Sequence, residues 1–136
     1  MTSHKDTENT KYWTDTQVNS LCDHVRQIGY EIHLYLGTGY LEKIYENALL
    51  HRLQKAGISA ESQVPTEVHD EDGFLLGDYK LDIVVEGVLV IELKAAKNID
   101  DAHIAQLLGY LRSTDLNHGL LINFGLCKYQ IRKLKI

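Results

Sequence analysis

Residues 81–97, LDIVVEGVLVIELKAAK, form two runs of β-branched and aliphatic residues on either side of a Glu-Gly pair. This pattern predicts a buried β-hairpin. Asp82, Glu92 and Lys94 interrupt the apolar runs. Because an unpaired carboxylate is costly in a low-dielectric interior, we expect the two acids to share a partner.

The turn of this hairpin decides whether Asp82 and Glu92 face the same side of the sheet. Side chains alternate between faces along a strand, so the register fixes which residues face together. A two-residue turn would pair position 82 with 91 and place the acids on opposite faces. A three-residue loop over 85–87, with its glycine as a G1 bulge, pairs 82 with 90 and places both acids and the lysine on one face. We favour the loop because such a bulge requires glycine at that position.

Two carboxylates on adjacent strands, with a lysine two residues after the second, form a site for a hard cation such as Mg²⁺ or Mn²⁺. Such a cation can activate a bound water and stabilise charge on a phosphate, while Lys94 orients or deprotonates the water. The implied reaction is phosphodiester hydrolysis. An ion pair between the lysine and one acid at the end of a sheet would explain the same residues without any chemistry.

The rest of the chain predicts one mixed α/β domain over residues 14–136, after a flexible tail at 1–13. Apolar steps of three and four predict helices, and short β-branched runs predict strands. The expected order is helices at 14–37 and 39–56, strands at 59–70, 73–87 and 88–96, a helix at 100–112, and strands at 118–125 and 128–136. Pro65 cannot donate to a ladder, so its strand should be an edge strand or bulged.

Composition narrows the function classes. The net charge of −5 argues against nucleic-acid binding through a broad basic surface. Only the C-terminal end is basic, and Lys128 and Arg132 lie within it. The two cysteines, Cys22 and Cys127, have no spacing typical of zinc or of a disulfide framework, so we expect a reducing, cytoplasmic setting. We expect neither a membrane span nor a signal peptide.

Several motifs, in order along the chain, resemble one known family. The D-(x)9-E-x-K pattern of Asp82, Glu92 and Lys94, followed by QLLGY at 106–110, resembles the PD-(D/E)XK nuclease superfamily, and Q-x-x-x-Y is typical of its recombination-exonuclease branch. GYLEKIYENAL at 39–49 is similar to the opening motif of the GxxExxY proteins. The similarity continues through QVP at 63–65 and GLLINFG at 119–125, whereas Leu81 replaces the proline of the superfamily name.

The resemblance implies a restriction-endonuclease-like αβββαβ core, with a central mixed sheet flanked by helices, and a metal-dependent nuclease. It implies a metal site made by Asp82, Glu92 and the backbone carbonyl of Leu93, with Lys94 as the catalytic lysine. Glu42 would bind the metal or orient its water.

The resemblance also implies nucleic acid, DNA or RNA, as the partner. Gln106 would contact the site or the nucleic-acid backbone, with Tyr110 beside it on the same helix face. If the chain is a nuclease, the basic residues Lys128 and Arg132 could touch phosphates.

Structural alternatives stay open for each of these residues. Glu42 could be only a first-turn acid of a helix capped by Gly39. Tyr110 could pack in the core while Gln106 bonds to a neighbour. The whole chain could be a catalytically silent nuclease-fold binding or regulatory module, working as a homodimer.

Overall fold

A computed structural model of the chain describes residues 12–125 and 128–136. Within these ranges the helices and strands follow the predicted order. They are α2 (Asp15–Leu36), α3 (Glu42–Lys55), β1 (Ala60–His69), β2 (Leu75–Val85), β3 (Leu89–Lys94), α4 (Asp101–Thr114), β4 (His118–Asn123) and β5 (Gln130–Lys135). Most of the predicted tail, residues 1–11, and Cys127 lie outside the described residues.

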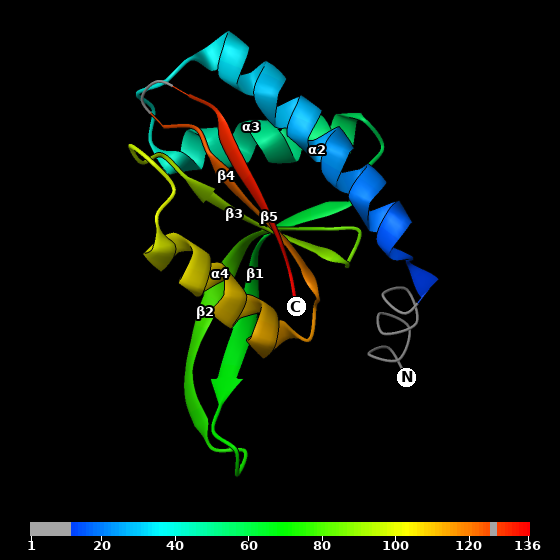
Figure 1. Ribbon diagram of the computed structural model, residues 1–136, viewed down its shortest axis with the longest axis vertical. Coiled ribbons are helices and arrows are strands. Elements are labelled where there is room, and N and C mark those ends of the chain that lie inside the picture. Colours follow the sequence, from blue (N-terminus) through cyan, green and yellow to red (C-terminus); the bar gives the residue numbers. More distant parts are fainter. Residues whose placement is uncertain (1–11, 126–127) are drawn as a thin grey trace.

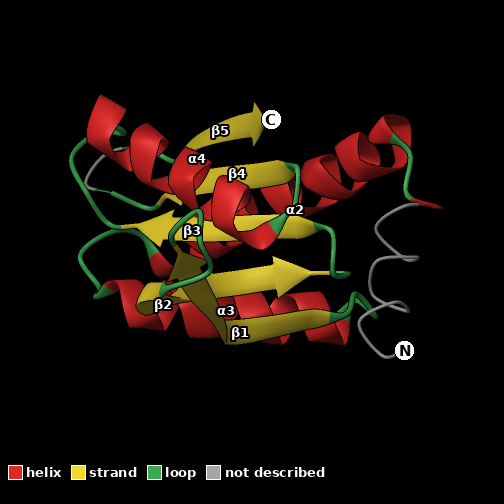
Figure 2. Ribbon diagram, turned by 90° about the horizontal axis from the view of Figure 1, so that it is seen from below, coloured by secondary structure: helices red, strands yellow, loops and turns green. Residues whose placement is uncertain are grey.

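The strands form one mixed sheet in the order β1-β2-β3-β4-β5 (Figure 2). β3 and β4 run parallel, and the other neighbouring strands run antiparallel. α4 makes the crossover connection that a parallel pair needs. β1 is an edge strand, so the prediction for Pro65 is confirmed. β3, which carries Glu92 and Lys94, is the central strand.

Helices cover both faces of this sheet. α2 and α3 pack on one face, and α4 packs on the other (Figure 1). The core under α2 and α3 includes Val25, Ile32, Leu49, Ile83 and Ile91. The core under α4 includes Val90, Leu107, Leu111 and Leu121. Because side chains alternate along a strand, Glu92 and Lys94 share the α4 face with Val90. Within the described ranges, no helix has the length and apolar character needed to cross a membrane.

The two N-terminal helices differ in how well their ends follow local sequence rules. α2 begins at the predicted cap, where Thr14 and Gln17 form a capping box. The second helix begins later than the predicted residue 39, and Gly39, named as its N-cap only in the alternative for Glu42, does not cap it. α3 begins at Glu42, and its N-cap, Leu41, makes no side-chain capping bond. Gly39 instead has φ of 106° in the connection between the helices, a conformation that favours glycine.

The turn between β2 and β3 differs by one position from the predicted loop. Val85 pairs with Leu89, so residues 86–88 make the connection. Glu86 and Gly87 both have positive φ, and the Val88 N–H donates to the Val85 carbonyl oxygen at 3.0 Å, as in a type I′ turn. Continued by one more pair, this register puts position 82 opposite 92. Because residues directly opposite each other face the same side, Asp82 and Glu92 still share a face, as they do with the predicted loop.

The hairpin of β1 and β2 projects beyond the helices (Figure 1). We call residues 65–80, its outer part, the arm. At its tip Phe74, Leu75 and Leu76 are exposed. Tyr79, nearer the body of the sheet, is half-buried.

Candidate active site

Asp82 and Glu92 meet where β2 and β3 separate. The ladder of paired residues between the two strands ends with the Ile83–Ile91 pair. Beyond this pair, a side chain replaces the backbone as the acceptor: the Asp82 Oδ2 accepts a hydrogen bond from the Leu93 N–H at 2.8 Å. The Glu92 residue is only 6% exposed. The predicted pair of acids is therefore brought together at the centre of the sheet.

The electrostatics of Glu92 are those of a buried acid beside another acid. Burial, and then the adjoining Asp82 carboxyl, raise the pKa of Glu92 to about 9, and the Lys94 ammonium offsets only part of this. Its Oε2 is buried without a hydrogen-bond partner among the described residues. Without a cation, Glu92 therefore holds a proton at neutral pH.

Lys94 lies at the end of β3 and reaches across to α4. Its Nζ donates to Oε1 of Gln106 at 2.9 Å. α4 presents Gln106 there because it begins at a capping box, in which Asp100 and His103 bond to each other's backbone N–H. The structure thus brings together the predicted lysine and the predicted glutamine.

Glu42 approaches the site from the opposite side of β3. It is the first residue of α3 and is exposed, and its Oε2 accepts a hydrogen bond from the Ala95 N–H at 3.3 Å. Its neighbour Glu46 has a different role, since that buried carboxylate binds Lys43 at 2.8 Å and Gln63 at 2.9 Å. Of the two glutamates on this helix, only Glu42 reaches the segment after Lys94.

Tyr45 holds the connection that leads into α3. Its hydroxyl donates to the Gly37 carbonyl oxygen at 2.7 Å and accepts from the Tyr40 N–H at 3.4 Å. Its ring stacks on Phe124 at 4.6 Å, and the residue is 1% exposed. The glycine and tyrosine of the G-x-x-E-x-x-Y motif therefore shape and anchor the start of the helix that carries Glu42.

Sequence reasoning missed Asn123, at the end of β4. This fully buried side chain accepts from the backbone N–H groups of Ala96 and Gly125 and donates to the Ala96 carbonyl oxygen and to Gln130. It thereby fixes the segment after Lys94. The signal was an amide residue inside the apolar run GLLINFG, where a buried polar group needs partners.

The other predicted nucleic-acid contacts lie at different distances from the carboxylates. Tyr110 stacks on Tyr79 of the arm, with ring centroids 4.3 Å apart. Arg132 is exposed on β5, two strands away from Glu92 and in the same row of the sheet. Lys128 is exposed just before β5. Only Tyr110 contacts the immediate surroundings of the site.

A divalent cation fits the carboxyl pair. The unpartnered Oε2 of Glu92 offers a buried oxygen ligand beside the Asp82 carboxylate, and hard cations prefer oxygen. Within the described ranges no group of three or more His, Cys, Asp or Glu side chains could hold a metal. Glu42 therefore does not complete a three-carboxylate cluster, and a cation here would need backbone oxygen and water as further ligands.

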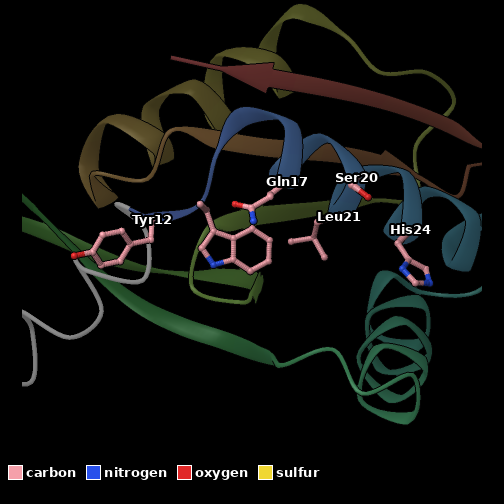
Figure 3. Close-up of a pocket in the computed structure, with 6 residues that line it drawn as sticks. Tyr12, Gln17, Ser20, Leu21 and His24 are labelled. Atoms are coloured by element: carbon pink, nitrogen blue, oxygen red, sulfur yellow. The ribbon is translucent and has the colours of Figure 1, made fainter.

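A separate hollow of about 450 Å³ lies at the start of α2 (Figure 3). It is lined by Tyr12, Trp13, Gln17, Ser20, Leu21 and His24. None of the residues predicted for catalysis or metal binding lines this hollow, so it is distinct from the carboxyl pair.

Comparisons with known proteins identify the family and the fold of the chain. A family model described as the PD-(D/E)XK nuclease superfamily matches residues 19–134. Among solved structures, SSO0001 is similar over 69% of this chain and 50% of its own, with 21% identity and a TM-score of 0.55. An alkaline exonuclease from Laribacter hongkongensis is similar over 90% of this chain and 70% of its own, with 12% identity and a TM-score of 0.51. The chain therefore spans half the length of SSO0001. No curated protein matches it significantly.

Proposed function

Since the chain belongs to the PD-(D/E)XK nuclease superfamily, we propose that it hydrolyses phosphodiester bonds of DNA or RNA with a divalent cation held by Asp82 and Glu92. The observation that carries the proposal is the buried, unpartnered Oε2 of Glu92 beside a second carboxylate and a lysine. A protein has little reason to keep such a pair in its central strand unless something positive binds there.

The ligands would be Asp82, Glu92 and the backbone carbonyl of Leu93, and the cation Mg²⁺ or Mn²⁺. The Leu93 N–H points toward β2, where it donates to Asp82. Within a strand, the N–H and C=O of one residue point to the same side, so the carbonyl of Leu93 faces the same edge. When bound, the cation would supply an activated water and stabilise charge on the phosphate.

Lys94 is the proposed catalytic lysine. Its hydrogen bond to Gln106 fixes the ammonium group on the face that carries Glu92. From there it can orient the attacking water and stabilise the negative charge that grows on the phosphoryl oxygens.

Glu42 and Gln106 are supporting residues in this proposal. Glu42 holds the backbone just after Lys94 through Ala95 and is available to orient a water at the site. Gln106 positions Lys94 and, from α4, lies where it can contact the nucleic-acid backbone.

The test is isothermal titration of Mg²⁺ and Mn²⁺ into the wild type and two variants on the same strand. Asp82→Asn should abolish or strongly weaken metal binding, because it removes an anionic ligand. Asp78→Asn, at an exposed position of β2, is the matched control and should bind as the wild type does. Equal binding by all three proteins, or no binding by the wild type, would contradict the proposed metal site.

Cleavage assays complete the test. The wild type should cut labelled single-stranded or double-stranded DNA or RNA in Mg²⁺ or Mn²⁺ and lose this activity in EDTA. Asp82→Asn should be inactive under the same conditions. Cleavage that persists in EDTA would refute metal dependence.

A further inference from the structure

A hollow of about 460 Å³ lies between the arm and α4, on the face of the sheet that carries the carboxyl pair. This volume is within the range of roughly 300–1,000 Å³ that is usual for small-molecule sites. Val68 and Tyr79 line it from the arm, and Gly109, Tyr110 and Arg112 line it from α4. The hollow is thus walled by two elements that the sheet topology brings together.

The hollow adjoins the proposed active site. Gln106, which lines it, also accepts the hydrogen bond from Lys94. Burial chiefly raises the pKa of both Tyr79 and Tyr110, and the Glu92 carboxylate, when ionised, adds to each rise. Both phenols therefore lie within the electrostatic reach of the carboxyl pair.

The lining suits a planar aromatic group that carries phosphate. Tyr79 and Tyr110, whose rings stack on each other, give the hollow an aromatic lining. The guanidinium of Arg112 supplies a positive charge that can stack on a ring or bind phosphate. Gly109 leaves the α4 side open, because a Cβ there would meet only the Arg112 guanidinium, at 3.7 Å. Aromatic stacking next to a basic side chain is how proteins hold unpaired bases.

We propose that this hollow binds one unpaired nucleobase of the strand whose phosphate is cleaved at Asp82 and Glu92. A base inside a duplex is stacked on its neighbours and cannot enter a side hollow without leaving the stack. The substrate is therefore single-stranded nucleic acid, or a duplex end that has opened. This inference rests on the proposed nuclease function and names its substrate class.

The test uses ligands that contain no diester bond, so that binding is measured without cleavage. A nucleoside 5′-monophosphate carries a base and a phosphate, whereas ribose 5-phosphate carries only the sugar and the phosphate. Each is titrated in Mg²⁺ into the full-length ¹⁵N-labelled protein and followed by NMR. The amide signals of Gly109 and Ser113 should shift at a lower concentration of the nucleotide than of ribose 5-phosphate, because only the nucleotide carries a base.

Gly109→Leu places an apolar side chain on the α4 wall of the hollow, where its Cβ would meet only the Arg112 guanidinium, at 3.7 Å. It should weaken nucleotide binding by about tenfold, the order expected when stacking of one base is lost. Ala102→Leu, at an exposed position of the same helix outside the hollow, is the control and should bind as the wild type does.

The outcomes separate this inference from the proposed function. Equal affinity of the wild type for the two ligands, or unchanged nucleotide affinity in Gly109→Leu, would refute the base site even if the protein binds metal and cleaves DNA or RNA. Base-dependent binding that is lost in Gly109→Leu supports the site even if no cleavage is found, in which case the proposed catalysis fails alone.

Discussion

Replacing Glu92 with glutamine should stabilise the metal-free protein at neutral pH. The folded chain raises the pKa of Glu92 from its ordinary value of 4.5 to about 9. Between these two values the folded protein holds a proton that the unfolded chain releases, so wild-type stability falls as pH rises. The slope is about 1.4 kcal/mol per pH unit, which amounts to about 3 kcal/mol by neutral pH as an upper bound. Glutamine does not titrate and escapes this loss.

The assay is urea unfolding in EDTA at several pH values between about 5 and 9. The free energy of unfolding of the wild type should decline across this range more steeply than that of Glu92→Gln. Glu61→Gln, which changes an exposed carboxyl on β1, is the control and should decline in parallel with the wild type. Parallel curves for the wild type and Glu92→Gln would refute the argument that Glu92 is protonated in the folded protein.

Bound Mg²⁺ should make the wild type more stable than Glu92→Gln. The wild type gains stability from bound metal, about 4 kcal/mol at a free concentration one thousand times the Kd, which exceeds the advantage of about 3 kcal/mol that Glu92→Gln has in EDTA. Glu92→Gln lacks a charged ligand and should gain little. An equal gain in both proteins would mean that Glu92 does not hold the cation.

Three further predictions concern the surroundings of this pair. Lys94→Ala should lower the cleavage rate about 10²–10⁴-fold while titration calorimetry still detects metal binding, and undiminished cleavage would exclude a catalytic role for the lysine. Mg²⁺ affinity should rise by about tenfold per pH unit below the pKa of Glu92, because binding must displace its proton, and a flat profile in calorimetry would contradict this. Tyr45→Phe removes the hydrogen bond to Gly37 and should lower the free energy of unfolding by about 1 kcal/mol, whereas Asn123→Ala leaves buried backbone groups unpaired and should lower it by about 2–3 kcal/mol. Urea unfolding measures both changes. A smaller loss of stability for Asn123→Ala than for Tyr45→Phe would argue that Asn123 does not hold the segment after Lys94 in place.

The elements that the sequence predicted correctly are those specified by nearby residues. The ends of α2 follow from Thr14 and Gly37, which act on the helix within one turn. The order of strands along the chain followed from short β-branched runs. Pro65, which cannot donate to a ladder, predicted an edge or bulged strand, and β1 is an edge strand.

The errors lie where simple capping and turn signals do not decide the structure. α3 begins at Glu42 because Tyr45 anchors the preceding connection to Gly37, and no local cap signals that start. The hairpin loop moved by one position because Glu86, rather than Gly87 alone, adopts positive φ.

The sequence predicted that Asp82 and Glu92 lie together, but it did not predict the buried Asn123 that holds the segment next to them. Alternation along two strands joined by a three-residue connection placed Asp82 and Glu92 on one face, and moving that connection by one position preserves this placement. The clamp made by Asn123 depends on the parallel pairing of β3 and β4 and on the path of the chain after Lys94. Periodicity in the sequence contains neither of these facts.

The projecting arm and the central strands of the sheet should differ in the free energy needed to open their hydrogen bonds. Its residues bury little apolar surface, whereas β3 and β4 are buried on both faces. Amide protons of the arm should therefore exchange with solvent through local opening, while those of β3 and β4 exchange only when the whole sheet comes apart. Because Tyr79 belongs to the arm, one wall of the hollow beside α4 can yield to accommodate purines and pyrimidines of different size while the carboxyl pair stays fixed on the rigid strands.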